Sequence, residues 1–455
     1  MFTPKRSDRR VFLKAAVASA AASVPYHFSN ERSLSHEIKS KNDRMNVGVI
    51  GSGGIARENM DASKQWLDIV AIADVDKSRR EEFNGRFAGG KAALTEDYRE
   101  VISREDIDVI HVATPDHWHT KPLVEAMLAG KDVYCEKPLT LTIDEGKLIR
   151  KVQRETGAVV QVGTMQRSQF DTFVKALAIV SEGRLGRIKQ VQAAIGSAPA
   201  SPAIPVRQVP DGLNWDRWLG PAPKVAYRHS EGSNNGLSNC HYEFRWWYEY
   251  SGGKLTDWGA HHVDICNWAL KLNGQSEGPN LIGGTASHPV EFKEGFPVET
   301  DRYNTATNFH FTVSYPSGAE MIIRNDTDNG VLITGDKGRI FVNRSKLVGK
   351  PVEDLQHNPL PEDALAKVYR GLPMERAGSR TAHWGNFLHC VRQRETPISD
   401  VESHMEMLNV CHLAGISARF GRALKWDNIN EQIVGDEQAN HFLARPYREG
   451  YEIEM

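Results

Sequence analysis

The chain has 455 residues, which is long enough for two domains that each bury a hydrophobic core. Hydrophobic residues make up 40% of it and charged residues 25%, the composition of an ordinary soluble globular protein. The formal net charge of -2 excludes the strongly basic surface with which proteins bind nucleic acid or an anionic membrane.

The N-terminus carries a pattern typical of export. Arg9 and Arg10 precede Phe12-Leu13-Lys14, and a weakly apolar, alanine-rich stretch follows over residues 15–24. This combination resembles a twin-arginine (Tat) signal. We therefore expect residues 1–44 to be signal and linker, and the protein to be exported by the Tat machinery to the periplasm or another extracytoplasmic space. No stretch approaches the ~20 apolar residues of a membrane helix, so we expect no membrane span in the mature chain.

From Asn46 onward, short apolar runs alternate with amphipathic stretches. This alternation predicts a parallel sheet with helices on both faces, which is an α/β Rossmann domain over residues 45–165. The expected strands cover residues 47–50, 68–74, 107–113, 132–135 and 158–163.

The pattern changes after about residue 185, where apolar residues recur with period two. This predicts an α+β C-terminal domain over residues 166–455, built on an antiparallel sheet with one exposed face. The expected elements are a strand at 188–193, hairpins at 309–323 and 331–342, a long loop over the sheet at 198–228 and a helical return at 382–422.

The five cysteines are odd in number and widely scattered, with no CxxC pair among them. Because folding in the cytoplasm before export tolerates free thiols, we expect buried, unpaired side chains. The cysteines are Cys135, Cys240, Cys266, Cys390 and Cys411.

A glycine-rich loop, Gly51-Ser52-Gly53-Gly54-Ile55-Ala56, lies between the first expected strand and a helix. In a dinucleotide-binding loop, Gly51 permits the tight turn and Gly53 lets the backbone approach a pyrophosphate, while Ala56 allows the helix to pack closely on the strand. The helix N-terminus, with Gly54 and Ile55, offers free N–H groups to the phosphates. The loop therefore predicts a nucleotide site.

Asp74 ends the second expected strand, about twenty residues after the loop. A carboxylate at this place accepts hydrogen bonds from the adenosine ribose hydroxyls and repels a 2′-phosphate, which favours NAD over NADP. Arg79 and Arg80 lie near enough to leave NADP open.

Three further segments carry a family pattern: Thr114-Pro115-Asp116-His117-Trp118-His119, Cys135-Glu136-Lys137-Pro138 and Asp257-Trp258-Gly259-Ala260-His261-His262-Val263-Asp264. With the glycine loop, they resemble the Gfo/Idh/MocA oxidoreductases, relatives of glucose–fructose oxidoreductase and inositol dehydrogenase, from residue 46 to the end. The resemblance implies a Rossmann domain followed by a domain with a large open antiparallel sheet. It also implies a carbohydrate or polyol substrate and a homo-oligomer.

The residues themselves suggest alcohol oxidation. Lys137 ends a parallel strand, where open sheets place their ligands, and Pro138 fixes the chain behind it, with a cis bond as one option. Its ammonium can stabilise a developing alkoxide. Asp257 and His261 share one face if their segment is a single helix, and histidine is a natural proton acceptor. The resemblance implies Lys137, Asp257 and His261 as the catalytic set.

The resemblance also implies cofactor contacts in the segments that follow two of the strands. These are Thr114, Pro115, His117, Trp118, His119 and Glu136. Arg167, Arg245 and His262 are candidate substrate contacts, His262 alternatively supporting the helix. We expect no metal, because the adjacent His261 and His262 point about 100° apart on a helix.

The function expected from these features is that of an exported NAD-dependent oxidoreductase that oxidises a secondary hydroxyl group of a sugar, polyol or glycoside. Because free cofactor is scarce outside the cytoplasm, we expect NAD to be held tightly. Two alternatives stay open. One is a redox-neutral glycosidase or lyase that uses bound NAD transiently, and the other is a non-catalytic sugar-binding protein.

Overall fold

The N-terminal half forms a six-stranded sheet with strand order β3-β2-β1-β4-β5-β6, all paired in parallel. The computed structural model describes residues 43–232, 236–275, 277–375 and 377–453, so nearly all of the expected Tat signal and linker lies outside the described residues. The strands are β1 (Met45–Ile50), β2 (Leu67–Ala73), β3 (Ala93–Thr95), β4 (Val109–Val112), β5 (Asp132–Cys135) and β6 (Val160–Val162). The predicted parallel sheet is confirmed, and β3 is an addition to it.

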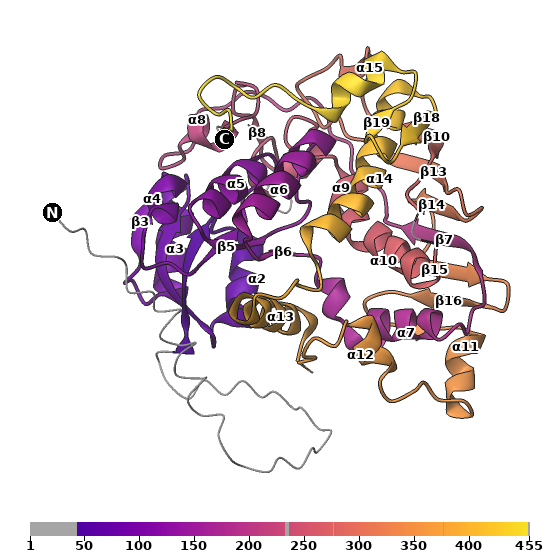
Figure 1. The fold of residues 1–455 in the computed structure, drawn as a ribbon. Coiled ribbons are helices and arrows are strands. Elements are labelled where there is room, and N and C mark those ends of the chain that lie inside the picture. Colours follow the sequence, from indigo (N-terminus) through magenta and orange to yellow (C-terminus); the bar gives the residue numbers. More distant parts are fainter. Residues whose placement is uncertain (1–42, 233–235, 276, 376, 454–455) are drawn as a thin grey trace, which may run out of the picture. The chain divides into compact units, whose positions relative to one another are not determined.

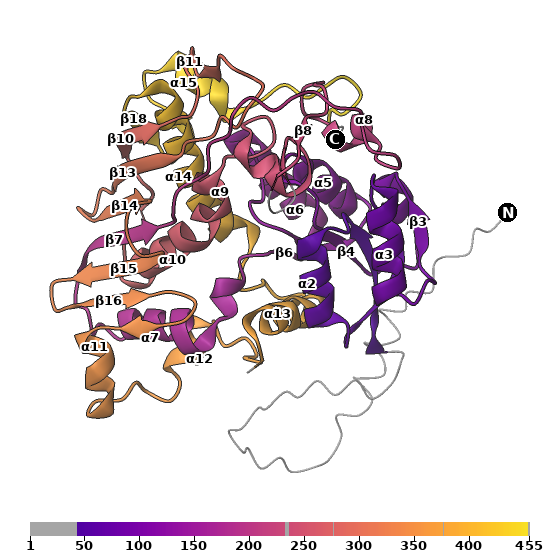
Figure 2. The same cartoon turned by 180° about the vertical axis from the view of Figure 1, so that it is seen from behind.

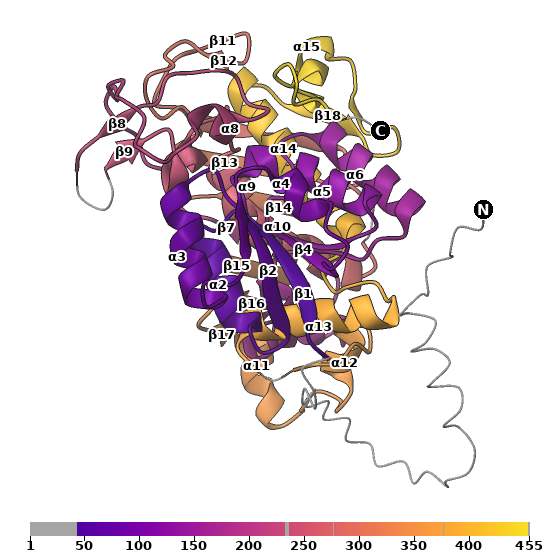
Figure 3. The ribbon, with the colours of Figure 1, turned by 90° about the vertical axis from the view of Figure 1, so that its left-hand side faces the viewer.

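Helices cover both faces of this sheet, with α2 and α3 on one side and α5 and α6 on the other (Figure 3). Local sequence sets their ends: Thr142 and Glu145 form a capping box at the start of α6, and Gly157 ends it with φ 65°. The helices are α2 (Gly54–Ser63), α3 (Lys77–Phe87), α4 (Tyr98–Ile102), α5 (Thr120–Leu128) and α6 (Ile143–Thr156), with the 3₁₀ turns η2 (Asp116–Trp118) and η3 (Met165–Ser168).

The C-terminal half is built on a nine-stranded sheet of order β17-β16-β15-β7-β14-β13-β10-β18-β19. The strands are β7 (Ile188–Ala194), β10 (Leu281–Ser287), β13 (Asn308–Ser314), β14 (Glu320–Arg324), β15 (Gly330–Gly335), β16 (Arg339–Val342), β17 (Leu347–Val348), β18 (Leu424–Asp427) and β19 (Gln432–Ile433). Both predicted hairpins are confirmed as β13–β14 and β15–β16.

This second sheet is mixed, whereas the sequence predicts an antiparallel one. β7 lies between β14 and β15 and pairs parallel with β14. β14 and β15 follow one another along the chain and lie on either side of β7. They run in opposite directions because a short turn joins them, so one of the two must be parallel to β7. The one-sided pattern holds: along β13, buried Phe309, Phe311 and Val313 alternate with less buried residues.

Helices α10 and α14 lie between the two sheets (Figures 1 and 2), and their buried faces cover one side of the nine-stranded sheet. The predicted helical return is confirmed as α13 and α14. Trp384 of α13 stacks on Tyr134 of β5, with ring centroids 4.0 Å apart, and so ties the C-terminal half to the first sheet. The remaining helices are η4 (Phe170–Val174), α7 (Lys175–Ser181), α9 (Lys254–Asp257), α10 (Gly259–Leu272), α11 (Lys350–Glu353), η7 (Asp354–Gln356), α12 (Ala364–Val368), α13 (Ser379–Gln393), α14 (Val401–Phe420), α15 (Glu437–Asn440) and η8 (His441–Leu443).

The long segment at 198–228 differs from its prediction. It contains the short helix α8 (Trp215–Leu219) and contacts the Rossmann domain, where the Asn214 N–H donates to the Val75 carbonyl at 3.0 Å. Trp218 packs there into a second hydrophobic cluster, and this packing holds the segment against the first domain. Nearby short elements are β8 (His229–Ser230), β9 (Leu237–Ser238), η6 (His241–Trp246), β11 (Phe292–Lys293) and β12 (Phe296–Pro297).

Two sequence features can be checked directly. All five cysteines are buried and unpaired, as predicted. Across residues 43–453, apart from the short undescribed gaps, no helix is both long and apolar enough to cross a membrane.

Candidate active site

A cavity of about 1000 Å³ opens at the carboxyl ends of strands β1, β2, β4 and β5. Open parallel sheets bind their ligands at this edge. The first domain lines the cavity with the glycine loop and the segments after the strands. The second domain adds residues of η6, α9 and α10, of the turn between β16 and β17, and of the start of α13.

The glycine loop leaves room for a ligand above the start of α2. Gly51 has φ +86°, and a Cβ atom there would lie 2.7 Å from the Ala113 carbonyl oxygen, so only glycine fits. A Cβ atom on Gly54 would meet nothing, and no side chain caps α2. The free N–H groups at this helix start suit a pyrophosphate. Ala56 is fully buried behind the loop, where the sequence places it.

Asp74 lies at the cavity wall in a fixed orientation. Its Oδ2 accepts hydrogen bonds from the Ser52 N–H and hydroxyl, both at 2.7 Å, and its Oδ1 accepts from the Asp76 N–H at 2.9 Å. A carboxylate has about four acceptor positions, so one remains for a ribose hydroxyl. Arg80 is directed away from this position, because it donates to the Asp74 carbonyl at 2.8 Å.

Lys137 and Asp257 join the two domains inside the cavity. The Lys137–Pro138 peptide is cis. Lys137 Nζ donates to Asp257 Oδ1 at 2.5 Å and to the Asp257 carbonyl at 3.0 Å. Burial raises the pKa of Asp257, but the cations of Lys137 and Arg245 outweigh it and hold the pKa at about 2. The Asp257 carboxylate is therefore ionised near neutral pH.

The helix that carries Asp257 is broken, so the condition under which Asp257 and His261 share one helical face is not met. α9 ends at Asp257, α10 begins at Gly259, and the His261 and His262 N–H groups both donate to the Trp258 carbonyl. The Asp257 carbonyl is thereby released from the helix and accepts from Lys137. Asp257 and His261 lie on successive helices and still line the same cavity.

His261 is held as a neutral imidazole. Its pKa lies well below the ordinary value because burial disfavours the charged form, and the nearby cations of Lys137 and Arg344 add to this. Within the described part of the chain, its buried Nδ1 has no hydrogen-bond partner. A neutral histidine that lines a cavity can accept a proton from a group bound there.

The remaining cofactor candidates divide into two groups. Thr114, Pro115, Trp118, His119 and Glu136 line the cavity. His119 is fixed there by the Pro138 carbonyl at 2.6 Å, and Glu136 accepts from Asn59 Nδ2 at 2.7 Å.

His117 does not line the cavity. Its Nε2 lies 2.9 Å from the Trp218 carbonyl, and its ring packs between Trp218 and Tyr250. His117 therefore packs against the second hydrophobic cluster. No local pattern predicts this, because Trp218 lies 101 residues further along the chain.

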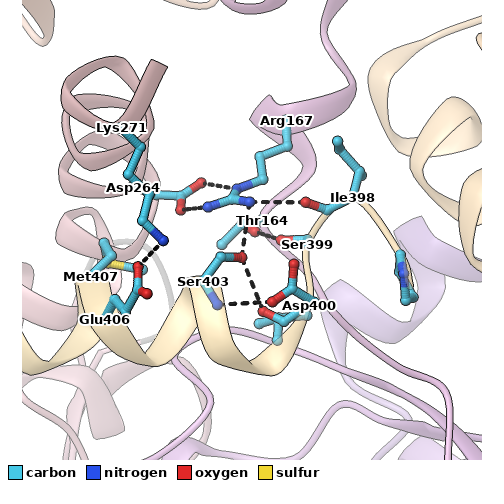
Figure 4. A network of polar contacts seen from close by, with 12 residues as sticks. Thr164, Arg167, Asp264, Lys271, Ile398, Ser399, Asp400, Ser403, Glu406 and Met407 are labelled. Atoms are coloured by element: carbon cyan, nitrogen blue, oxygen red, sulfur yellow. Dashed lines mark hydrogen bonds and ion pairs between the residues drawn. The ribbon is translucent and has the colours of Figure 1, made fainter. Parts of the chain in front are cut away.

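Of the substrate candidates, only Arg245 reaches the cavity, where its Nε lies 3.6 Å from Asp257 Oδ1. Arg167 is buried outside it and pairs with both oxygens of Asp264, at 2.6 and 2.8 Å (Figure 4). Its NH1 donates to the Ile398 carbonyl and Ser403, so it binds α10 to the start of α14. This role replaces the predicted substrate contact.

His262 is fully buried, and its Nε2 lies 2.9 Å from Asn329 Oδ1. It too is absent from the cavity lining and supports α10. Among the described residues, no group of three or more His, Cys, Asp and Glu side chains could hold a metal ion.

Sequence reasoning missed further charged residues of the cavity, among them Asp116, Arg344 and Arg380. Asp116 accepts from the Ser251 hydroxyl at 2.6 Å, and burial raises its pKa to about 7. Arg344 and Arg380 enter from the C-terminal half. Asp116 belongs to the segment 114–119, which is part of the family pattern, whereas no local pattern marks the two arginines.

Two family models match the chain in its two halves. The model of the Gfo/Idh/MocA oxidoreductases described as an NAD-binding Rossmann fold matches residues 45–164, and that of the C-terminal alpha/beta domain matches residues 200–453.

Curated relatives match over about a third of this chain. An uncharacterised oxidoreductase of Rhizobium meliloti is 31% identical over 33% of this chain and 45% of its own length. The inositol 2-dehydrogenase of Rhodococcus erythropolis is 29% identical over 36% and 47%. A glycosyl hydrolase family 109 protein of Shewanella sp. is 34% identical over 30% and 35%. The chain thus spans less than half the length of these relatives.

Solved structures share the fold across both domains. A levoglucosan dehydrogenase in complex with NADH and levoglucosan has a TM-score of 0.59 and 19% identity, covering 84% of this chain and 99% of its own. The WlbA dehydrogenase from Bordetella pertussis, in complex with NADH and UDP-GlcNAcA, has a TM-score of 0.58 and 16% identity, covering 85% and 99%.

Proposed function

Because the chain belongs to the Gfo/Idh/MocA oxidoreductase family, we propose that it oxidises a secondary hydroxyl group of a sugar, polyol or glycoside with NAD. A bound nicotinamide supplies the hydride acceptor for such a reaction. The residues of the cavity fit this cofactor: the open position at Gly54 leaves space for the pyrophosphate at the start of α2, and Asp74 keeps one acceptor position for a ribose hydroxyl.

The observation that carries the proposal is the placement of Lys137, Asp257 and His261 in the same cavity as the glycine loop. His261 is a neutral imidazole in the cavity lining, so it can take the hydroxyl proton. Lys137 is held by Asp257 and presents a positive charge that stabilises the oxygen as its proton leaves.

NAD rather than NADP is the proposed cofactor. The Asp74 carboxylate would repel a 2′-phosphate, and the nearby arginines are engaged elsewhere. Arg80 lies 3.4 Å from Glu96, and Arg79 lies 3.5 Å from Asp76.

Export through the Tat machinery, with NAD held tightly, completes the proposal. Arg9 and Arg10 support export of a folded protein, and a periplasmic enzyme must bring its cofactor along. Mass spectrometry of protein purified from the periplasm tests this: bound NAD or NADH supports tight retention, and protein free of nucleotide contradicts it.

A redox-neutral glycosidase or lyase is the second candidate, and the similarity to a glycosyl hydrolase family 109 protein favours keeping it. NADH formation separates the two. A dehydrogenase forms one NADH for each substrate oxidised, whereas a redox-neutral enzyme cleaves a glycoside without NADH accumulating.

The experiment that tests the leading function uses purified protein and a panel of sugars and polyols, with NADH followed by its absorbance. We expect NADH with at least one substrate in the wild type and its loss in His261→Ala, with NAD binding kept. Wild-type protein that binds NAD and converts no member of the panel contradicts the proposal.

A further inference from the structure

We infer that the substrate carries an anionic group, a carboxylate or a phosphate, and that Arg344 binds it. This inference rests on the proposed function, because it assigns a substrate class to the same cavity. Arg344 stands in the turn between β16 and β17 and lines the cavity with Lys137, Asp257 and His261.

Arg344 lies next to the catalytic residues. Its guanidinium carbon is 4.7 Å from the ring centre of Trp258, the residue that separates Asp257 from α10. Stacking on an aromatic ring fixes the plane of a guanidinium and leaves its edge free for hydrogen bonds. A group bound at this edge is therefore adjacent to the proposed proton acceptor, His261.

The turn that carries Arg344 is held firmly. Asn343 Oδ1 accepts from the N–H groups of Ser345 and Lys346, at 3.0 and 2.9 Å. Gln169 Nε2 donates to the Arg344 carbonyl at 2.6 Å. These hydrogen bonds fix the backbone of the turn that carries Arg344. A side chain on a fixed turn is better placed to recognise a ligand than the side chain of a mobile surface arginine.

No described carboxylate forms a salt bridge with Arg344, although Asp257 and Glu58 act on its charge from a longer distance. The other cavity cations have carboxylate partners: Lys137 has Asp257, and Arg380 has Glu58 at 2.6 Å. Over the described ranges, no carboxylate lies within 4.0 Å of the Arg344 guanidinium, and NH1 and NH2 have no hydrogen-bond partner. Gln166, in the amide orientation that satisfies both its partners, accepts only from Arg344 Nε at 3.2 Å.

A guanidinium with two free terminal nitrogens binds a carboxylate or phosphate through two parallel hydrogen bonds. The pyrophosphate of the cofactor has its own place at the start of α2, on the opposite domain. The free edge of Arg344 is therefore assigned to the substrate.

The test measures binding, independently of turnover. NADH-loaded protein is titrated by calorimetry with uronic acids, with sugar phosphates and with the neutral sugars of the same stereochemistry. We expect an acidic sugar to bind more tightly than its neutral counterpart. Preference for the uronic acid or for the phosphate ester identifies the anion. Equal or tighter binding of the neutral sugars, or no binding by any acidic member, overturns the inference.

Substitutions test whether Arg344 is the residue that binds the anionic group. Arg344→Met should weaken binding of the preferred acid by about 10- to 100-fold, the range for a hydrogen bond to a charged group, and leave the neutral sugar little changed. Arg344→Lys should recover part of the loss. Lys346→Met removes the same charge from the same turn but outside the cavity lining, so it should have no effect.

Three further outcomes are distinguishable. An equal loss of affinity for the acidic sugar in Lys346→Met overturns the assignment to Arg344. The affinity would then depend on the total positive charge of the turn and not on Arg344 itself. Weaker binding of NADH itself in Arg344→Met also overturns it, since the arginine would then serve the cofactor. Selective binding of an acidic sugar without any NADH formation from NAD would contradict the proposed function and leave the assignment of Arg344 standing.

Discussion

Replacing Asp257 by asparagine removes the anion that Lys137 and Arg245 share and keeps the shape of the side chain. Although burial raises the pKa of Asp257, the two cations lower it to about 2, from an ordinary value of 3.8. At about 1.4 kcal/mol for each pH unit, the ionised carboxylate contributes about 2–3 kcal/mol to folding at pH 7. We expect Asp257→Asn to lose at least this much, because it also leaves two largely buried cations without a partner.

The pH dependence has a definite sign. Since the folded pKa lies below the unfolded one, the contribution of Asp257 is complete above about pH 4 and is lost as the pH falls toward about 2. Urea denaturation of the wild type and the variant should therefore show a gap in the unfolding midpoint at pH 7 that narrows below pH 4.

The matched control is Asp326→Asn, which removes a carboxylate that pairs with Arg324 at the protein surface. Solvent screens this pair, so little change is expected. The reasoning is refuted if Asp257→Asn is as stable as the wild type at pH 7, or if its deficit stays constant to the lowest pH at which both proteins fold.

Four further predictions follow from single contacts. Lys137→Met should lower turnover by about 10²- to 10³-fold and keep NAD affinity; unchanged turnover contradicts its role. Gly51→Ala should abolish NAD binding in calorimetry, because its Cβ meets the Ala113 carbonyl, whereas Gly85→Ala in an open position of α3 should bind normally. The pKa of His261 lies well below 6.5, so the pH profile of kcat/KM should show no fall near pH 6.5 once Asp116, whose pKa burial raises to about 7, is replaced in Asp116→Asn; a fall near pH 6.5 that persists in this variant would contradict this. Arg167→Met should lower the thermal midpoint strongly, since it strands buried Asp264, and a stable variant with impaired sugar binding would restore the substrate role.

Much of the fold could be predicted because its strands are marked by their own residues. Strands that are largely buried on both faces, such as β1 and β4, are near-continuous apolar runs. The strand β3 was missed because it is short and its residues are exposed. The parallel pairing of β7 with β14 could not be predicted, because it depends on how distant segments are ordered in the sheet.

The features of the site also divide into those with a local signal in the sequence and those without one. The glycine loop, Lys137, Asp257 and His261 carry local signals, and all line the cavity. The break at Trp258 has no such signal, because Lys137, which donates to the freed Asp257 carbonyl, lies 120 residues away in the sequence. Arg167 is a candidate substrate contact in the sequence for a related reason. Its partner, Asp264, is distant along the chain, so no local pattern shows that the two side chains pair.

The central claim is that Lys137, Asp257 and His261 carry out NAD-dependent oxidation of a hydroxyl group. Its most direct test is the amount of NADH formed by purified wild-type protein with each member of a sugar and polyol panel, neutral and acidic, compared with Lys137→Met. We predict one NADH for each molecule oxidised by the wild type, and a rate about 10²- to 10³-fold lower in the variant. Substrate conversion without NADH, or an equal rate in Lys137→Met, would contradict the claim.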